Sequence, residues 1–338
     1  MKVAVIGYGY WGPNLVRNFA WTEGVDVKYV CDLSQERLDK VKGMFPSVEH
    51  TTTNLQEVLD DPEVEAIAIS TPTSGHFPIA KAALEAGKHV LVEKPMTDNY
   101  KDGKILVDLA ATKGLTLMTD HTFIYTGAVR KIKELIDAGE IGDIYYFDSV
   151  RVNLGLFQSD VNVMWDLAPH DLSIMLYCLD KKPRAVSAHG MAHVKGQPVN
   201  TAYMTVYFDD TTIAHFNVNW LSPIKVRMTM IGGTKKMIVW DDNLNSEKIK
   251  VYDTGVHLND KDEDIYKALI SYRTGDMYSP QVANIEALKL ECSHFVESIQ
   301  NKTKPDTDGA FGLTIVAMLE AAQQSLDNEG KIISLEDL

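Results

Sequence analysis

A glycine-rich motif near the start of the chain most constrains what this sequence can fold into. The apolar run at residues 3–6 stops directly before the motif G-Y-G-Y-W-G at 7–12, and a helical pattern of apolar residues follows. A second apolar run ends in Asp32, twenty residues after Gly12. Strand, glycine turn, helix, strand and acid, in this order, form the complete fingerprint of a dinucleotide-binding unit. The sequence therefore predicts a Rossmann unit at the start of the chain.

Each glycine of the motif has a physical role toward a dinucleotide. Gly7 permits the tight turn, Gly9 lets the backbone approach a pyrophosphate, and Gly12 lets the helix pack closely on the strand. The free N–H groups at the start of the helix then face the phosphates. We also assign Tyr10 and Trp11, which lie inside the motif, to the cofactor site.

Asp32 indicates which dinucleotide is bound. A carboxylate at the end of the second strand accepts hydrogen bonds from the ribose hydroxyls and repels a 2′-phosphate, so we expect NAD rather than NADP. Arg37 is close enough in the sequence to leave some room for NADP, and we include it in the cofactor site. In a second interpretation Asp32 caps the next helix, with Gln35 completing a capping box. The two roles are compatible.

Composition limits the classes of protein to which the chain can belong. Its 338 residues suffice for two domains, and 45% hydrophobic with 24% charged residues is ordinary for a globular protein. A net charge of −14 argues against a nucleic-acid partner. Three cysteines, far apart in apolar patterns, predict buried free thiols and a reducing, cytoplasmic location. We see no signal peptide and no apolar run that would span a membrane, so we expect no membrane association.

The periodicity of apolar residues divides the chain. Short apolar strands alternate with helices at first, which indicates a parallel, doubly wound sheet that binds its ligands at the carboxyl ends of the strands. Long strands with period-two alternation follow, as in an antiparallel sheet with one open or partner-covered face. We expect an NAD-binding Rossmann domain over 1–122 and a substrate and oligomerisation domain over 123–308. The segment 253–280 has little periodicity and predicts a loop or an excursion over the sheet.

Two of the predicted strand ends carry polar residues that belong in a cofactor cleft. The apolar run at 66–69 leads into T-P-T-S-G-H at 71–76, and the run at 89–92 leads into E-K-P at 93–95. The proline stiffens the second position, and the strand end directs its lysine toward the cleft. The residues that we assign to the cofactor site on this ground are Thr71, Pro72, His76, Glu93 and Lys94.

A second polar group precedes a predicted helix of the later domain, in the stretch W-D-L-A-P-H-D at 165–171. Proline is tolerated in the first turn of a helix, so Pro169 places Asp166 near the N-cap. Asp166 and His170 then lie on one face of the helix. A histidine held by a carboxylate can accept a proton. The alternative is a capping aspartate beside an incidental histidine.

Polar residues just upstream of this helix are candidates for contact with a substrate, although an ordinary polar strand end and loop would have the same composition. The other histidines show no metal-ligand spacing such as H-E-x-x-H, and C-x-x-C is absent, so we expect no metal. The residues that we assign to substrate binding are Arg151, Asn153, Gln158, Asn162 and Trp165.

The whole chain resembles the glucose–fructose oxidoreductase and inositol dehydrogenase family (Gfo/Idh/MocA). The resemblance rests on the glycine motif, Asp32, the T-P…H of 71–76, the E-K-P of 93–95, and Asp166 with His170. It implies an α/β fold: an N-terminal Rossmann domain and a C-terminal α/β domain on a large, mostly antiparallel sheet. It also implies oligomer contacts through that sheet, as in a homodimer or homotetramer, and a final helical segment, 309–338, that returns to the first domain.

The resemblance implies oxidation of a secondary alcohol on a sugar or cyclitol. His170 matches the proton-transfer histidine, Lys94 the lysine that hydrogen-bonds the reacting oxygen, and Asp166 the carboxylate that orients substrate or histidine. Members of the family differ over whether the lysine or the histidine takes the proton. Many members have a glycine and an acid where this chain has Ala168 and Ser173, so the resemblance assigns no role to Asp171.

Within the family, G-Y-G-Y-W-G-P-N-L and W-D-L-A-P-H-D resemble a branch that oxidises nucleotide-linked sugars at C3. This implies a UDP-N-acetylhexosamine or its uronate as substrate. The alternatives are a free-sugar or cyclitol dehydrogenase or reductase using NAD or NADP, and a non-catalytic dinucleotide-binding sensor. The residues that either cover a bulky ligand or only pack on the sheet are Tyr266, Tyr272, Arg273 and Tyr278.

Overall fold

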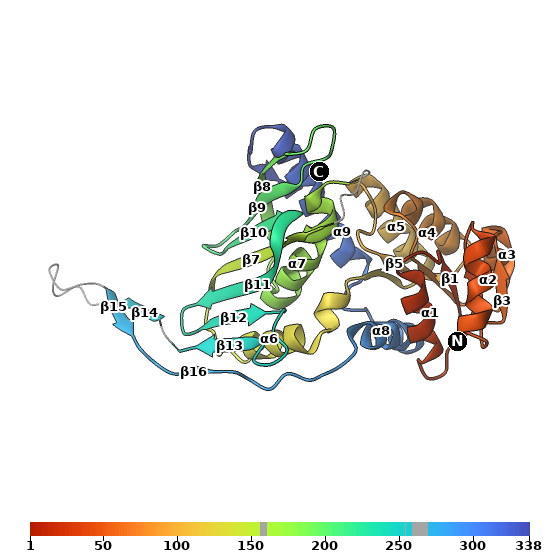
Figure 1. Ribbon diagram of the computed structural model, residues 1–338, viewed down its shortest axis with the longest axis horizontal. Helices are drawn as coiled ribbons and strands as arrows, with labels where there is room; N and C mark the ends of the chain where they lie inside the picture. Colours follow the sequence, from red (N-terminus) through yellow and green to blue (C-terminus); the bar gives the residue numbers. More distant parts are fainter. Residues whose placement is uncertain (156–160, 254, 259–269) are drawn as a thin grey trace. The chain divides into compact units, whose positions relative to one another are not determined.

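The protein is described by a computed structural model that covers residues 1–155, 161–253, 255–258 and 270–338 (Figure 1). It forms two compact units. Unit 1 comprises Met1–Tyr125 and Ile285–Glu320, and unit 2 comprises Thr126–Asn284 and Ala321–Leu338. A parallel sheet in unit 1 and a mostly antiparallel sheet in unit 2 confirm the predicted α/β fold.

The division by contacts differs from the three segments expected from the sequence. Helix α8 (Ala287–Asn301) belongs to unit 1, because Phe295 packs edge-on against Phe19 with ring centroids 6.3 Å apart. Helix α9 (Gly309–Asp327) is divided after Glu320. The last residues of the chain belong to unit 2, where β17 (Ile333–Ser334) pairs with a strand of the second sheet.

Unit 1 is built on a six-stranded parallel sheet of order β3-β2-β1-β4-β5-β6. Strand order reverses between β1 and β4, and such a reversal creates a crevice at the carboxyl ends of the strands. Five of the strands match predicted ones to within two residues, whereas the short, polar β3 was not predicted. The strands are β1 (Lys2–Ile6), β2 (Asp26–Cys31), β3 (His50–Thr52), β4 (Ala66–Ile69), β5 (His89–Glu93) and β6 (Leu117–Asp120).

Helices connect these strands, as expected for a doubly wound sheet. The β-strands are apolar along most of their length because both faces are covered; all four residues of β4 are buried. Each helix buries one stripe of mainly apolar side chains, such as Leu15, Val16 and Phe19 of α1. The helices between strands are α1 (Gly12–Ala20), α2 (Gln35–Met44), α3 (Leu55–Asp60), α4 (His76–Glu85) and α5 (Tyr100–Lys113), with the short 3₁₀ turns η1 (Thr73–Gly75) and η2 (Thr122–Tyr125).

Unit 2 is built on a nine-stranded sheet of order β16-β13-β12-β11-β7-β10-β9-β8-β17. Its strands pair antiparallel except for β10 with β7. Helices α6 (Gly127–Asp137) and α7 (Val163–Leu179) belong to this unit. The remaining strands are β7 (Ile144–Leu154), β8 (Pro183–Met191), β9 (Thr201–Phe208), β10 (Ile213–Asn219), β11 (Leu221–Gly233), β12 (Met237–Asp241), β13 (Ile249–Tyr252) and β16 (Met277–Tyr278).

The segment 253–280 is partly regular. Strands β14 (Gly255–Leu258) and β15 (Ile270–Arg273) pair with each other in a separate two-stranded sheet, and β16 joins the edge of the large sheet. Arg273 forms an ion pair with Asp253 at 2.8 Å, and the Tyr278 hydroxyl donates to Glu140 Oε2 at 2.8 Å. Tyr266 and the side chain of Tyr272 lie outside the described residues.

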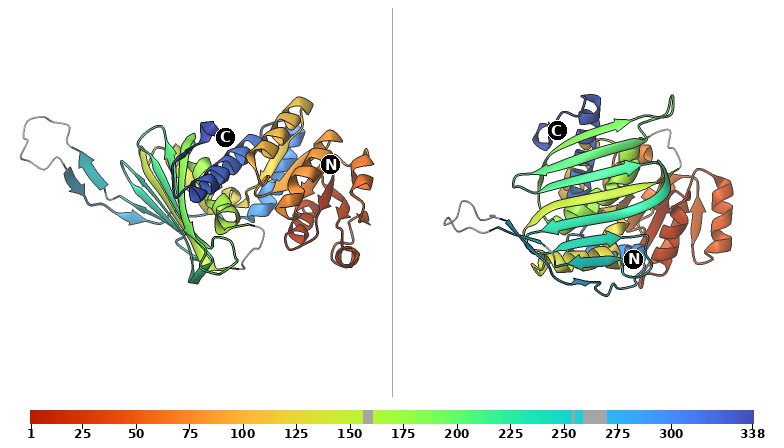
Figure 2. Two further views of the ribbon diagram at one scale, coloured as in Figure 1. Left: turned by 90° about the horizontal axis from the view of Figure 1, so that it is seen from above. Right: turned by 60° about the vertical axis from the view of Figure 1, so that its left-hand side comes forward.

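The two faces of the large sheet differ in cover. Side chains such as Met204 and Phe216 point to the face on which α7 packs and are buried. The alternate residues point to the other face, which the right-hand view of Figure 2 shows in front of α6 and α7. On that open face Tyr203 is 46% exposed and Ile213 43%, and the Tyr203 ring stacks on His215 with centroids 6.3 Å apart.

We predict that the protein is a homodimer or homotetramer that buries this open face. A broad, partly apolar sheet face usually packs against a partner, and closed symmetric assemblies are the common solution. Multi-angle light scattering of the unmodified protein at micromolar concentration should give a multiple of 37.7 kDa. Tyr203→Lys combined with Ile213→Lys should reduce the mass, and Gln56→Lys on the exposed surface of α3 should not. A monomeric unmodified protein would contradict the prediction.

Candidate functional site

The glycine turn of unit 1 has the geometry that a dinucleotide needs. Gly7 has φ +96°, and a Cβ there would lie 2.8 Å from the backbone of Ser70. A Cβ on Gly12 would lie 2.2 Å from the carbonyl oxygen of Gly7. A Cβ on Gly9 would meet only open space, since the nearest atom would be an Arg37 side-chain nitrogen at 3.9 Å. The first and last glycines therefore close the turn on the sheet, and the middle one leaves the backbone accessible to a pyrophosphate.

Asp32 ties this turn to the loop after β2. Its Oδ2 accepts a hydrogen bond from the Tyr8 N–H at 2.6 Å and lies 3.4 Å from Arg37 Nη1, and its Oδ1 accepts from the Ser34 N–H at 2.8 Å. The cap of α2 is Ser34, whose hydroxyl accepts from the Arg37 N–H. The interpretation of Asp32 as a helix cap with Gln35 is therefore wrong. The carboxylate lies beside the turn at the end of β2, where a ribose would meet it.

Trp11 and Tyr10 differ in how they are held. The Tyr10 side chain is 94% exposed. The Trp11 indole Nε1 donates to Asp120 Oδ2 at 3.0 Å, which joins the glycine turn to the end of β6. Trp11 also stands at the N-cap position of α1 without a side-chain cap. Pro13 has no N–H and Asn14 donates to the Trp11 carbonyl oxygen at 2.9 Å, so the Gly12 N–H is the one left for a ligand in the first turn of that helix.

His76 connects the loops that follow β4 and β5. Its ring is buried, with Nδ1 2.9 Å from the carbonyl oxygen of Pro95 and Nε2 2.9 Å from that of Thr71. Burial lowers the pKa of His76. The side chain therefore shapes the loops that carry Thr71, Pro72 and Lys94. The peptide bond between Lys94 and Pro95 is cis.

Glu93 lies directly before the predicted catalytic lysine. Its Oε2 accepts a hydrogen bond from the Lys94 N–H at 3.0 Å. Burial, together with the nearby Asp120 carboxylate, raises the pKa of Glu93 well above its ordinary value. Within unit 1 the structure thus brings the glycine turn, the β2 acid and the ends of β4 and β5 to one edge of the sheet.

In unit 2, Asn162 rather than Asp166 caps helix α7. Its Oδ1 accepts from the N–H groups of Met164 and Trp165 at 3.0 and 3.2 Å, and its Nδ2 donates to Gln323 Oε1 at 2.6 Å. The helix therefore starts at Val163, and Pro169 lies inside it and not in its first turn. The prediction for Pro169 was wrong because the cap signal of Asn162 was assigned to substrate binding.

Asp166 is fixed by a residue that we did not assign to the site. The indole Nε1 of Trp220 donates to Asp166 Oδ2 at 3.0 Å, and Trp220 is itself fully buried. Asp166 lies in the first turn of α7, where the helix dipole favours a carboxylate, and His170 lies one turn further on the same face. Both are partly exposed. In the sequence, the feature that could have pointed to Trp220 is its place at the end of the period-two strand pattern 214–220, next to the predicted site.

Arg151 and Asp171 form a buried, bidentate ion pair. Arg151 Nε and Nη2 donate to the two Asp171 oxygens at 2.7 and 3.0 Å, and both side chains are 4% exposed. Arg227 lies nearby, and burial followed by the charge of Arg151 lowers its pKa. The structure therefore gives Arg151 a buried partner and gives Asp171 a role, while substrate contact by Arg151 stays a prediction.

The other predicted substrate residues have different surroundings. Asn153 and Trp165 are half-buried, near the end of β7 and at the start of α7. Gln158 lies outside the described residues. Among the residues that the structure covers, no three His, Cys, Asp or Glu side chains are grouped to hold a metal ion. All three cysteines are buried free thiols, as predicted, and burial raises the pKa of Cys31 to about 11 and that of Cys178 to about 12.

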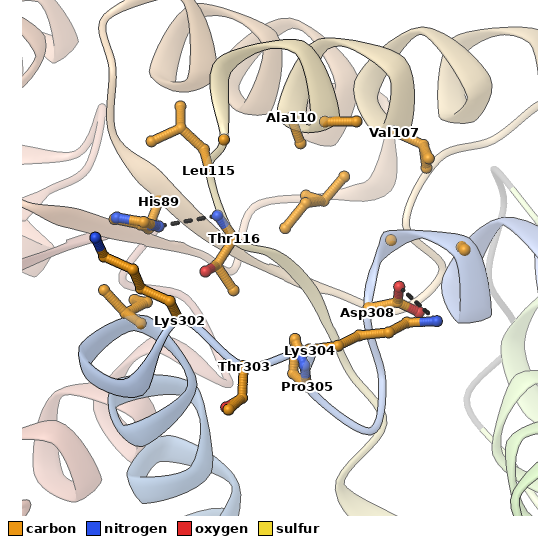
Figure 3. Close-up of a pocket in the computed structure, with 16 residues that line it drawn as sticks. His89, Val107, Ala110, Leu115, Thr116, Lys302, Thr303, Lys304, Pro305 and Asp308 are labelled. Atoms are coloured by element: carbon orange, nitrogen blue, oxygen red, sulfur yellow. Dashed lines mark hydrogen bonds and ion pairs between the residues drawn. The ribbon is translucent and has the colours of Figure 1, made fainter.

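A cavity of about 520 Å³ in unit 1 lies away from this edge (Figure 3). Its lining includes His89 and Thr116 at the amino-terminal ends of β5 and β6, together with Lys302 and Asp308. Dinucleotides bind at the carboxyl ends of the strands, so this cavity is not the cofactor site. In the part of the chain that the structure describes, no helix is both long and apolar enough to cross a membrane.

Two family models match the sequence. Residues 1–121 match the oxidoreductase family with an NAD-binding Rossmann fold, and residues 129–239 match the GFO/IDH/MocA C-terminal domain. The chain is 24% identical to the scyllo-inositol 2-dehydrogenase (NADP(+)) IolW of Bacillus subtilis (strain 168), over 99% of this chain and 96% of that protein. It is 26% identical to the UDP-N-acetylglucosamine 3-dehydrogenase of Acidithiobacillus ferrooxidans, over 94% of each.

A solved structure has the same fold. The oxidoreductase from Agrobacterium radiobacter in complex with NAD+, L-tartaric acid and magnesium superposes with a TM-score of 0.82, covering 100% of this chain and 99% of that one. The two sequences are 17% identical. The unit 1 sheet of our chain is thus an NAD-binding Rossmann domain by sequence family and by fold.

We predict that NAD binds more tightly than NADP, because the Asp32 carboxylate repels a 2′-phosphate. Asp32→Ser should weaken NAD binding by about tenfold, the value of one strong hydrogen bond, and should narrow or reverse the preference, with Arg37 left to meet the phosphate. Fluorescence titration of NADH and NADPH measures both affinities. Asp39→Ser, on the exposed face of α2, is the control and should change neither. Equal affinity of the unmodified protein for both cofactors would refute the assignment.

Proposed function

Since this chain belongs to the GFO/IDH/MocA family of oxidoreductases, we propose that it oxidises C3 of a UDP-N-acetylhexosamine, or of its uronate, with NAD. The general reaction in this statement is the one that the family catalyses. The chain is an NAD(P)-dependent dehydrogenase that acts on CH–OH groups of sugars or cyclitols. The carbon, the sugar and the roles of individual residues are our proposal.

The observation that carries the proposed chemistry is a carboxylate and a histidine one turn apart on α7. Trp220 holds the carboxylate of Asp166 at 3.0 Å, so this carboxylate has a fixed direction from which to orient His170. A neutral imidazole can accept the proton of an alcohol. We assign proton transfer to His170 and its orientation to Asp166.

Lys94 is the proposed cationic partner of the reacting oxygen. It follows β5 directly, at the edge of the sheet where a Rossmann domain holds its ligand. A lysine ammonium there would stabilise the negative charge that develops on the alcohol oxygen as its proton leaves. When bound, NAD supplies the acceptor for the hydride. The glycine turn, Asp32 and Arg37 are the groups that we propose to hold it.

The nucleotide sugar is supported by the likeness to the Acidithiobacillus enzyme, whose substrate its name gives as UDP-N-acetylglucosamine. Asn153 and Trp165 are the described residues that we retain for substrate contact. Arg151 and Asn162 are engaged by Asp171 and by the α7 backbone. Arg273 and Tyr278 have partners of their own in unit 2, so they give this proposal no support.

A second candidate function is a cyclitol or free-sugar dehydrogenase that uses NADP. It is favoured by Arg37, which is half-exposed beside Asp32 and suited to a 2′-phosphate, and by the NADP(+) in the name of the Bacillus relative. The distinction from the leading proposal is one of substrate and cofactor, because the groups proposed for proton transfer are the same.

We predict that Lys94→Ala and His170→Ala each lower turnover by about 10²–10⁴-fold, the usual value of general acid–base help, and leave NADH affinity nearly unchanged. Stopped-flow rates across pH and NADH titrations measure the two effects. Lys101→Ala, an exposed lysine of α5, is the control. Near-normal rates of His170→Ala across pH would move the proton transfer to Lys94.

We predict NADH formation with UDP-N-acetylglucosamine or its uronate, and none with free sugars or inositol. Oxidation of an alcohol by NAD is often uphill, so an aminotransferase that consumes the ketone should be added to draw the reaction forward. Absorbance of NADH reports the turnover. Clear oxidation of a free sugar or inositol, with neither UDP-sugar oxidised under the coupled conditions, would establish the second candidate instead.

A further inference from the structure

Three carboxyl groups from three elements meet in the interior of unit 1. Glu93 ends β5, Asp120 ends β6, and Glu291 lies on α8. Asp120 is 2% exposed and Glu291 is 0% exposed. The side chains of Glu93 and Glu291 both lie within hydrogen-bonding reach of the Asp120 carboxylate. The proposed chemistry uses neither Asp120 nor Glu291.

The surroundings of Glu291 favour the neutral, protonated form of its carboxyl group. Within the described residues, neither of its side-chain oxygens has a hydrogen-bond partner, because the one O–H of the neighbouring Thr122 is donated to Asp120 at 2.5 Å. A fully buried, ionised carboxylate without donors is strongly disfavoured, and such a group takes up a proton instead. Burial, and then the nearby Asp120 carboxylate, raise the pKa of Glu291 well above its ordinary value. The protonated group has one O–H donor, and Asp120 is the acceptor beside it.

Asp120 also forms a hydrogen bond with a residue of the glycine-rich turn. Its Oδ2 accepts from the Trp11 indole at 3.0 Å, and its Oδ1 accepts from the Thr122 hydroxyl at 2.5 Å. Asp120 therefore accepts from Trp11 in the turn and from Thr122, and the carboxyl group of Glu291 from α8 lies beside it. Bonds of this charge-assisted kind are the stronger ones in proteins.

We propose that Glu291, as a neutral carboxylic acid, holds Asp120 against Trp11 and so positions the glycine-rich turn for the dinucleotide. Trp11 directly precedes Gly12, and α8 packs on α1 through Phe295 and Phe19. If Glu291 lost its proton, two negative charges would face each other in the interior. Their repulsion would displace Asp120 and release Trp11. The proposal rests on the turn being the cofactor site and is independent of the sugar.

The other ionisable groups around the cluster do not replace Glu291 in this role. Burial lowers the pKa of His121 to about 3, so its ring is neutral, and burial raises the pKa of the Cys292 thiol well above its ordinary value. Arg17 and Glu286 pair with each other at 2.6 Å at the surface. The charged and titratable groups around the cluster are Glu93 and Lys94 from β5, Asp120 and His121 from the end of β6, and Glu286 and Cys292 from α8.

The sign of the pH dependence follows from the raised pKa of Glu291. The folded protein retains a proton that the unfolded chain loses near pH ~4.3, so this group favours folding fully at low pH. Its contribution is lost as the pH rises through the folded-state pKa. NADH affinity should fall over the same range, because Trp11 is released as Glu291 ionises.

The decisive variant is Glu291→Gln, which keeps an N–H donor for Asp120 but cannot ionise. NADH affinity, from fluorescence titration, and the thermal midpoint without cofactor should be measured over a series of rising pH values. We expect both to fall with pH in the unmodified protein and to fall much less in Glu291→Gln. Glu297→Gln, an exposed residue of the same helix, should retain the unmodified profile.

Removal of the donor completes the test. At the low-pH end, where Glu291 carries its proton, Glu291→Leu and Trp11→Phe should each weaken NADH binding by about tenfold. The double variant should be no weaker than either single one, because both break the same chain of bonds. An unmodified pH slope in Glu291→Gln, or additive losses in the double variant, would overturn the proposal. Failure of the unmodified protein to bind NADH at any pH would instead refute the cofactor assignment.

Discussion

The close approach of strand β1 and helix α1 is the constraint on which the nucleotide-binding half of this protein depends. There is no room for a side chain at Gly12, because a Cβ would lie 2.2 Å from the Gly7 carbonyl oxygen. Gly7 itself needs a positive φ. With both conditions met, the helix starts directly at the sheet edge, beside the crevice between β1 and β4.

Hydrogen bonds from three neighbouring segments hold this turn. The Ser70 hydroxyl donates to the Gly7 carbonyl at 2.8 Å, Asp32 accepts from the Tyr8 N–H at 2.6 Å, and Asp120 accepts from the Trp11 indole at 3.0 Å. Each partner stands at the carboxyl end of a different strand. A preorganised turn loses less conformational freedom when a ligand binds, so these bonds favour affinity as well as geometry.

Unit 2 holds its polar residues in a different way. The buried pair of Arg151 and Asp171 joins strand β7 to helix α7, and breaking such a pair by removing one partner would leave an uncompensated charge. On the same helix, Asp166 accepts a hydrogen bond from the Trp220 indole directly after β10 and stays partly exposed. Neighbouring carboxylates of α7 thus differ in role: one is committed to the interior, and the other remains available to orient His170.

The sequence by itself determined the fold class, the glycine turn and the acid after β2, because these depend on local spacing and on period-two or helical patterns. Only the tertiary structure decided which polar groups are committed to the interior. Arg151 and Asn162 read as substrate residues, but their partners Asp171, Met164 and Gln323 are set by how β7, α7 and α9 meet. No sequence motif singles out Glu291 or Trp220. Their importance comes from Asp120 and Asp166, which are remote in sequence and near only in the fold, and no local pattern records such a pairing.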